Sequence, residues 1–292
     1  MAMWDAVAQQ IGEATGEPFA VDSTRNLGGG CINSVYRVSG GGRSFFVKSN
    51  DASLAWMFEA EAEGLDAMAA TDTIRVPRPV CWGSDGGQAY LVLEYLEMGG
   101  SVPPERFGRE LAAMHRASAD RFGWHRDNTI GSTPQPNGWV GDWISFWRDR
   151  RLGFQLELAA RNGAAKSLVS RGEELMEHFP ALFDRYTPVP SLLHGDLWGG
   201  NWAATGAGEP VIFDPATYYG DREADLAMTE LFGGPGARFY DAYNDAWPVD
   251  AGYGVRKTLY NLYHILNHFN LFGGGYAAQA DRMTGRLLSE LR

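Results

Sequence analysis

Residues 194–201 (H-G-D-L-W-G-G-N) follow a short apolar segment and combine a carboxylate, Asp196, with an amide, Asn201. Further along, the apolar run 211–213 leads into a second carboxylate, Asp214. Transfer of a phosphoryl group needs these types. One carboxylate orients the attacking hydroxyl and accepts its proton, while an amide oxygen and another carboxylate hold Mg²⁺ against the nucleotide phosphates. The three residues therefore favour phosphoryl transfer as the chemistry of this chain.

The order of these residues carries more weight than any one of them. Considered alone, H-G-D predicts only a turn, and Asp214 predicts only a cap for the segment that follows. The spacing D-x-x-x-x-N, followed by a strand and a further Asp, also occurs in protein kinases. Three such elements, each at the end of a predicted strand, favour the catalytic interpretation over the structural one.

A glycine-rich turn near the N-terminus could hold the nucleotide. It lies between two predicted strands and consists of Gly28, Gly29, Gly30, Cys31, Ile32 and Asn33. Glycines lack Cβ atoms, so backbone N–H groups in such a turn can approach phosphates closely. Glycine turns between strands are also common without any ligand, so this turn indicates nucleotide binding only in combination with the other motifs.

Lys48 ends the apolar strand 45–48 and could reach the nucleotide phosphates, although alone it could equally be a solvated lysine at a sheet edge. The next helix carries Glu59, Glu61 and Glu63, one of which is expected to pair with Lys48. We choose Glu61, because it stands four residues before Leu65, as the pairing glutamate does in sugar and aminoglycoside kinases. The connector 91–96 then assigns Glu94, Tyr95 and Leu96 to adenine binding, by position alone.

The elements that must position these residues fall into two parts. Alternating β-formers at 34–39, 43–49, 76–82 and 88–95 predict strands, joined by glycine-rich turns, and a helix is expected over 53–70. After residue 101 most segments show helical spacing, apart from a strand-like region at 191–213. We therefore predict an α+β, protein-kinase-like fold with two lobes: a small β-rich N-lobe with one main helix at 1–97, and a larger helical C-lobe at 98–292.

The composition excludes several classes of protein. A net charge of −11 argues against a nucleic-acid partner, because phosphate binding needs clustered Lys and Arg. The two cysteines, Cys31 and Cys81, form no disulfide framework and suit a reducing cytosol. Neither a signal peptide nor a membrane span is expected, so the predicted location is the cytoplasm.

With these residues in view, the chain resembles the aminoglycoside phosphotransferase/choline kinase superfamily, and within it the fructosamine (ketosamine) kinases. The superfamily features are L-A-A-M-H at 111–115 and G-D-R-E-A-D-L-A at 220–227. The features typical of fructosamine kinases are W-G-G-N at 198–201, where relatives often carry H-P-G-N, and D-P-A-T-Y-Y-G-D-R-E at 214–223. The resemblance extends from about residue 19 to the final helix.

This resemblance implies ATP-dependent phosphorylation of the 3-hydroxyl of a ketosamine, the adduct that a sugar leaves on an amine, as repair or catabolism. On that basis Asp196 is the expected catalytic base, and Asn201 and Asp214 are the expected Mg²⁺ ligands. Lys48 and Glu61 are the expected phosphate-positioning pair. The expected partner is a small ketoamine or a glycated protein amine.

Three further expectations come with the family. Trp198 either offers an apolar face to the substrate or braces its own loop as a core tryptophan. Cys31 either forms a redox-sensitive disulfide between subunits, as in some relatives, or is an unreactive thiol in a monomer. Asp221 and Asp225 are expected to hold the loop after Asp214 by hydrogen bonds.

Two other functions remain open at this point. The acceptor could be another small alcohol, such as an aminoglycoside or a choline-like compound, since an acidic surface suits those cations as well. The chain could also be an inactive kinase fold used for binding. Degenerate kinases usually lose a motif residue, however, whereas Lys48, Asp196, Asn201 and Asp214 are all present.

Overall fold

The computed structural model describes residues 2–28 and 32–292. The chain forms two compact units, one made of residues 1–103 and 203–214 and the other of residues 104–202 and 215–292. The sequence predicted one boundary after residue 97, whereas the first unit extends to residue 103 and also contains the later segment 203–214. Backbone bridges join Arg75 to Val211 and Met98 to Thr205, which explains why this segment returns to the first unit.

The first unit is built on an antiparallel five-stranded sheet of order β1-β2-β3-β5-β4. Its strands are β1 (Ser23–Asn26), β2 (Ser34–Gly40), β3 (Arg43–Asp51), β4 (Pro79–Asp85) and β5 (Gln88–Glu94). Gly41 and Gly42 both have positive φ, as do Gly86 and Gly87, so glycines make the two tight turns possible. The fourth strand begins later than the expected residue 76, since Arg75 bridges to Val211 instead.

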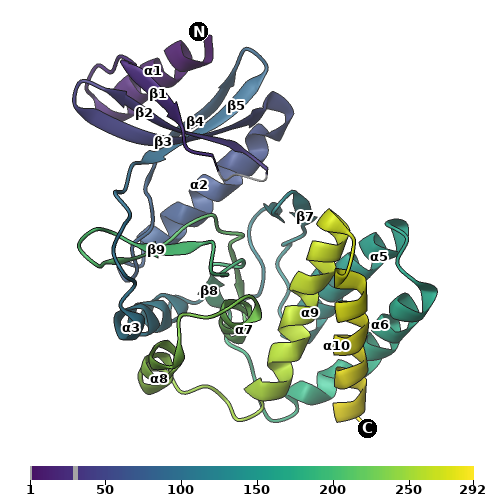
Figure 1. Ribbon diagram of the computed structural model, residues 1–292. Helices are drawn as coiled ribbons and strands as arrows, with labels where there is room; N and C mark the ends of the chain where they lie inside the picture. Colours follow the sequence, from purple (N-terminus) through teal and green to yellow (C-terminus); the bar gives the residue numbers. More distant parts are fainter. Residues whose placement is uncertain (1, 29–31) are drawn as a thin grey trace. The chain divides into compact units, whose positions relative to one another are not determined.

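Two helices cover the faces of this sheet, α1 (Ala2–Thr15) on one side and α2 (Ala55–Ala69) on the other (Figure 1). Val7 and Ile11 of α1 pack in a buried cluster with Val47 and Val92. Because side chains alternate along a strand, the neighbour of Val47, Lys48, faces the opposite side, where α2 lies. This alternation brings Lys48 toward the glutamates of α2.

Short elements connect the sheet to its surroundings. The 3-10 turn η1 (Ala52–Leu54) joins β3 to α2, and Asp51 caps it by accepting a bond from Ser53 N at 2.9 Å. Within the returning segment, β9 (Trp202–Ala204) pairs with β10 (Pro210–Ile212). The strand β10 ends just before Asp214.

The second unit is mainly helical. Its helices are α3 (Pro104–His115), α4 (Trp143–Phe146), the π-helical η2 (Trp147–Leu152), α5 (Gly153–Arg161), α6 (Lys166–His178), η3 (Phe179–Phe183), α7 (Glu223–Leu231), α8 (Ala237–Ala246), α9 (Tyr253–Phe272) and α10 (Tyr276–Glu290). Two small two-stranded sheets pair β6 (Asn128–Ile130) with β7 (Thr133–Gln135) and β8 (Ser191–Leu193) with β11 (Tyr218–Gly220).

The long helix α9 lies at the centre of this unit and packs against α5, α7 and α10 (Figure 1). Its Leu259, Leu262, Ile265 and Leu266 are fully buried. Helices α3 and α8 cross closely at Gly108, where an added Cβ would lie 2.3 Å from the carbonyl oxygen of Phe239. None of the helices within the described ranges is long and apolar enough to cross a membrane.

Candidate active site

Lys48 is the centre of a buried ionic cluster in the first unit. Its Nζ donates to Glu61 Oε1 at 2.6 Å and to Asp214 Oδ1 at 2.6 Å, and the lysine is only 4% exposed. Burial alone would lower the pKa of Lys48, but the charges of Asp214 and Glu61 raise it above its ordinary value. Lys48 is therefore a permanent cation held between two carboxylates.

Glu61 is the member of the helix trio 59, 61 and 63 that bonds to Lys48. Burial raises the pKa of Glu61, while Lys48 opposes that shift by favouring the ionised carboxylate. The strand alternation at Lys48 and the helical face of α2 together select this glutamate.

Asp214 is a non-glycine residue with a left-handed backbone, at φ 58°. Such a conformation is uncommon for residues other than glycine and persists only where the surroundings hold it. Here the side chain is half exposed and is held on one oxygen by Lys48. Backbone strain of this kind concentrates at functional sites, which agrees with the predicted role of Asp214 as a metal ligand.

The glycine-rich turn lies between β1 and β2, and its residues 29–31, including Cys31, lie outside the described residues. Gly28 has φ +67° and donates its N–H to Asn26 Oδ1 at 2.8 Å. On the other side, Asn50 Nδ2 donates to Ile32 O at 3.1 Å and to Asn33 Oδ1 at 2.8 Å. Asn50, two residues after Lys48 in β3, is a residue that motif reading missed, because a half-buried asparagine late in a strand carries no distinctive signal.

The connector after β5 is held by side chains around Glu94. The carboxylate of Glu94 accepts from Arg75 NH2 at 2.7 Å and from the backbone N of Arg78 at 2.7 Å. The guanidinium of Arg37 lies 4.4 Å from the ring centre of Tyr95. These contacts fix the segment 94–96, and the predicted adenine contacts of Glu94, Tyr95 and Leu96 remain a prediction.

In the second unit, the loop 194–201, which contains the predicted base, leaves β8 through a turn that only glycine can make. Gly195 has φ +84°, and an added Cβ would lie 2.1 Å from the carbonyl oxygen of Ala216. The following Asp196 is partly buried, and Asn201 Nδ2 donates to its backbone oxygen at 2.8 Å and to its Oδ2 at 3.4 Å. The predicted base and a predicted metal ligand are therefore joined directly within one loop.

Trp198 is 40% exposed, although it is a large apolar side chain. Its indole lies over Gly200, where an added Cβ would be 2.3 Å from the ring. The consecutive glycines of W-G-G-N thus give the indole room to fold back on its own loop. This exposure favours a surface that contacts a ligand over a core tryptophan, and the substrate role of Trp198 remains a prediction.

Asp225, in the first turn of α7, holds the start of the loop 194–201. Its Oδ2 accepts from His194 N at 2.7 Å and from His115 Nε2 at 3.1 Å, and its Oδ1 accepts from Gly195 N at 2.8 Å. Burial would raise the pKa of Asp225, but the hydrogen bond from His115 and the electrostatic effect of His115 and His194 keep it below its ordinary value. The carboxylate therefore stays ionised and orients the backbone that carries Asp196.

The expectation that Asp221 and Asp225 hold the loop after Asp214 by hydrogen bonds fits Asp221, whose carboxylate accepts bonds from Tyr186 and Tyr260 at the end of that loop. It is wrong for Asp225, which accepts from the backbone of residues 194 and 195 and not from the residues after Asp214. Instead Gln135 Nε2 donates to Ala216 O at 3.0 Å, and Asn128 Nδ2 donates to Thr217 O at 2.8 Å. Both amides come from the β6–β7 pair, whose place beside this loop is decided by tertiary packing rather than by sequence distance.

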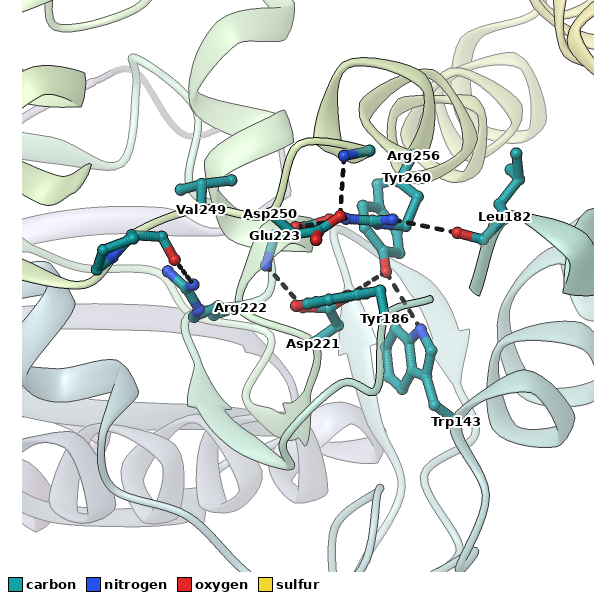
Figure 2. Close-up of polar contacts among 12 residues, drawn as sticks. Trp143, Leu182, Tyr186, Asp221, Arg222, Glu223, Val249, Asp250, Arg256 and Tyr260 are labelled. Carbon is teal, nitrogen blue, oxygen red and sulfur yellow. Dashed lines mark hydrogen bonds and ion pairs between the residues drawn. The ribbon is translucent and has the colours of Figure 1, made fainter. Parts of the chain in front are cut away.

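Residues 221–223 anchor the beginning of α7 to its surroundings. Figure 2 shows Asp221 facing Tyr186 and Tyr260, and Glu223 facing Arg256. The hydroxyls of Tyr186 and Tyr260 donate to Asp221 at 2.8 and 2.5 Å, while Arg256 makes two bonds to Glu223 at 2.7 and 2.9 Å. Burial raises the pKa of Glu223 to about 7, against the opposing effect of Arg256. These buried contacts hold the helix that presents Asp225.

Comparison with known proteins identifies the family. The fructosamine kinase family model matches residues 3–290. A probable ketoamine kinase of Synechocystis sp. is 53% identical over 294 residues, covering 98% of this chain and 97% of the relative. The chain belongs to the fructosamine kinase family. A chloroplastic protein-ribulosamine 3-kinase of Arabidopsis thaliana is 46% identical over 271 residues, covering 91% and 82% of the two chains.

Solved structures agree with this family and with its fold. A Thermobifida fusca protein, provisionally described as a fructosamine-3-kinase, matches with a TM-score of 0.88 at 34% identity, covering 98% and 99% of the two chains. An aminoglycoside phosphotransferase in complex with AMP-PNP and hygromycin B matches with a TM-score of 0.64 at 16% identity, covering 97% and 98%, and this likeness concerns the fold alone. The predicted family and the predicted α+β, protein-kinase-like fold are confirmed.

Two side chains of this chain, those of Asn201 and Asp214, are of a type that can bind a magnesium ion. Asn201 uses its amide nitrogen to bond Asp196, so its carbonyl oxygen is the atom suited to a cation. Asp214 presents a half-exposed carboxylate whose Oδ1 contacts Lys48. Carboxylate and amide oxygens are the ligands that Mg²⁺ prefers, so each of these two groups, considered in its own unit, is of a type that fits the ion that phosphoryl transfer requires.

Proposed function

We propose that this protein is an ATP-dependent kinase that phosphorylates the 3-hydroxyl of ketosamines, such as fructosamine or ribulosamine adducts of amines. The observation that carries the proposal is the loop in which Asn201 is bonded to Asp196 while Asp225 holds the backbone just before it. A carboxylate so oriented, in a member of the fructosamine kinase family, suits proton removal from a sugar hydroxyl. The proposed role is repair of glycated amines or their catabolism.

The proposed mechanism assigns each residue one task. Asp196 orients the 3-hydroxyl and accepts its proton as the oxygen attacks the γ-phosphorus of ATP. Lys48, kept in place by Glu61, contacts the α- and β-phosphates, and the turn 28–33 surrounds the phosphates with backbone N–H groups. The segment 94–96 supplies backbone hydrogen bonds to adenine. Asn201 and Asp214 would hold Mg²⁺, which supplies charge neutralisation on the phosphates when it is bound.

The choice of a ketosamine as acceptor rests on the relatives and on Trp198. The similar proteins are named for ketoamines and ribulosamines, whereas the aminoglycoside phosphotransferase is similar only in fold. An exposed indole in the loop of the base can cover the apolar side of a ketose or attract a protonated amine. An aminoglycoside or a choline-like alcohol is the alternative acceptor.

An ADP-release assay tests the proposal directly. Mg-ATP is supplied with fructosyl-, ribulosyl- and erythrulosyl-lysine, with kanamycin and choline as comparison acceptors. We expect ADP release with at least one ketosamine, and a 3-phosphorylated product by NMR. Release with kanamycin or choline alone would replace the ketosamine by the alternative acceptor, and release with none of the five would contradict both.

We further propose a cytoplasmic monomer that can form a redox-linked dimer through Cys31. The second cysteine, Cys81, is half-buried, and burial raises its pKa to about 12, so its thiol stays protonated and unreactive. Mild peroxide should therefore give a DTT-reversible dimer in the native protein and in Cys81→Ser, but not in Cys31→Ser. A non-reducing gel that shows only monomer after peroxide would contradict the dimer.

A further inference from the structure

A cluster of aromatic side chains in the second unit has no part in the mechanism above. Phe232, at the end of α7, lies 4.9 Å from the ring of His268 in α9. The ring of His268 also lies 5.8 Å from that of Phe272 and 5.2 Å from that of Tyr276, measured between ring centres. We call these four residues the aromatic patch. Phe232 is 41% exposed and Phe272 is 60% exposed, so the patch presents apolar surface to solvent.

The end of α7, which carries Phe232 of the aromatic patch, lies beside the loop 194–201 that contains Asp196. A Cβ at Gly199 would lie 3.6 Å from the carbonyl oxygen of Gly233, so the loop and the end of α7 pass each other there in close contact. Trp198 and Phe232 each immediately precede one of these glycines, and both are about two-fifths exposed. The aromatic patch therefore has one end, at Phe232, next to a segment that passes beside the loop of Asp196, and it extends from there to residues of α9 and α10.

Besides the hydroxyl of Tyr276, the patch contains the imidazole of His268, and a hydrogen bond shows which ring nitrogen carries the hydrogen. His268 Nδ1 lies 2.8 Å from the carbonyl oxygen of His264, which can only accept, so Nδ1 carries the hydrogen. In the neutral ring Nε2 is then an acceptor. Burial lowers the pKa of His268, which favours this neutral form near pH 7. The patch thus combines exposed rings, which attract hydrocarbon and cations, with a hydrogen-bond acceptor.

We propose that Phe232, His268, Phe272 and Tyr276 form the subsite for the amine substituent of the ketosamine. This inference rests on the proposed function and adds to it the part of the substrate that lies beyond the sugar. The rings contact the hydrocarbon of the substituent, and Nε2 of His268 accepts a bond from an N–H of the amine. Because Phe272 is mostly exposed, the subsite suits a lysine side chain that continues into a peptide.

A substituent series tests the inference. The ribulosamines of methylamine, butylamine, benzylamine and Nα-acetyl-lysine amide are compared in kcat/KM with the native protein, Phe232→Ala and Phe272→Ala. We expect kcat/KM to rise with substituent size in the native protein, and each variant to lose about five- to tenfold on the benzyl and lysine adducts, as removal of a ring contact would cause. The methyl adduct should change less than twofold.

Trp82→Ala is the matched control, because Trp82 is a 40% exposed aromatic residue of β4 in the first unit. It should leave the whole series unchanged. His268→Phe keeps a ring but removes the acceptor, and it should lower kcat/KM for all four adducts without altering KM for ATP. Equal losses across the series in Phe232→Ala and Phe272→Ala would overturn the inference.

Binding without turnover separates this inference from the proposed function. Calorimetry with the benzyl and methyl adducts, in the absence of ATP, measures whether the aromatic patch recognises the substituent. Tighter binding of the benzyl adduct that is lost in Phe272→Ala supports the subsite even if no ADP is released, in which case the proposed function alone fails. Equal binding of both adducts to the native protein would overturn the subsite.

Discussion

Lys48 Nζ lies 2.6 Å from Asp214 Oδ1, although 166 positions separate the two residues in the chain. The same nitrogen lies 2.6 Å from Glu61 Oε1 in α2. One cation is therefore shared by a helix carboxylate and by the carboxylate proposed to bind Mg²⁺. A substitution at any of the three residues should destabilise the charges of the other two, because removing one partner of a buried pair leaves an uncompensated charge.

Lys48→Ala should raise KM for ATP, and its effect should be coupled to that of Glu61→Gln. The physical reason is that Glu61 acts only by holding the lysine, so the double variant should lose little more than Lys48→Ala alone. The expected coupling is roughly 0.5–3 kcal/mol in the free energy of ATP binding, measured in a double-mutant cycle. Glu63→Gln, on the same helix, is the matched control and should be additive with Lys48→Ala. Additivity at Glu61 would remove it from the phosphate site.

Asp196→Asn and Asp214→Asn should have different effects on turnover and on Mg-ATP binding. The first removes the base and should abolish most turnover while Mg-ATP binding stays largely intact. The second removes a proposed metal ligand and the partner of Lys48, so it should weaken Mg-ATP binding as well. Calorimetric titration with Mg-ATP distinguishes the two. A large loss of affinity in Asp196→Asn alone would exchange the assigned roles.

Asp225→Asn should slow turnover through the loop that carries Asp196. An asparagine is neutral and has one acceptor oxygen where Asp225 has two, so either His194 N or Gly195 N would lose its acceptor and the other would bond to an uncharged oxygen. A lost bond of this kind is expected to lower kcat about tenfold, equivalent to ~1.4 kcal/mol, with KM for ATP little changed. Asp245→Asn, at an exposed position of α8, is the control and should have native kinetics. Native kcat in Asp225→Asn would show that the loop holds without this carboxylate.

Trp198→Ala should damage recognition of the ketosamine and not of ATP. Loss of an aromatic contact to a sugar face or an amine is expected to cost about 1–2 kcal/mol at a partly desolvated site, which is roughly ten- to thirtyfold in affinity. The loss should appear in ketosamine KM or kcat/KM, and Trp198→Phe should recover part of it. Equal damage to ATP kinetics would indicate a collapsed loop, and unchanged ketosamine kinetics would make Trp198 structural.

His264 should make the fold less stable in acid. It is buried in α9, and burial lowers its pKa to about 3, whereas in the unfolded chain it titrates near 6.5. Below pH 6.5 the unfolded state therefore binds a proton that the folded state does not, and the free energy of unfolding falls by up to about 1.4 kcal/mol per pH unit. His264→Leu should lose less stability between pH 7 and 5 than the native protein does, as measured by urea unfolding.

The pH profile of the native protein must be compared with that of His264→Leu, because Glu223 stabilises the fold in acid and so opposes the effect of His264. Its pKa of about 7 lies above the ordinary 4.5, so its contribution to stability grows as the pH falls between these values. His178→Leu, which replaces an exposed histidine at the end of α6, is the control and should keep the native pH profile. Identical pH profiles for His264→Leu and the native protein would contradict the role assigned to His264.

The sequence by itself determined the family, the fold class and the types of residue available for chemistry. Strands, glycine turns and helices depend on short-range periodicity and on backbone freedom, so the hairpin turn at residues 41–42 and the helix after β3 were readable from local patterns. Likewise, the short loop 196–201 keeps Asp196 and Asn201 within reach of each other whatever the rest of the chain does.

Only the tertiary structure decided which distant groups meet. No local pattern shows that Lys48 bonds to Asp214, that segment 203–214 returns to the first unit, or that Asp225 holds Gly195 N. The expectation for Asp225 was wrong for this reason: a motif near a loop in sequence need not touch that loop. Such contacts follow from how buried faces pack, and packing depends on the shapes of many side chains at once rather than on any residue's own preferences.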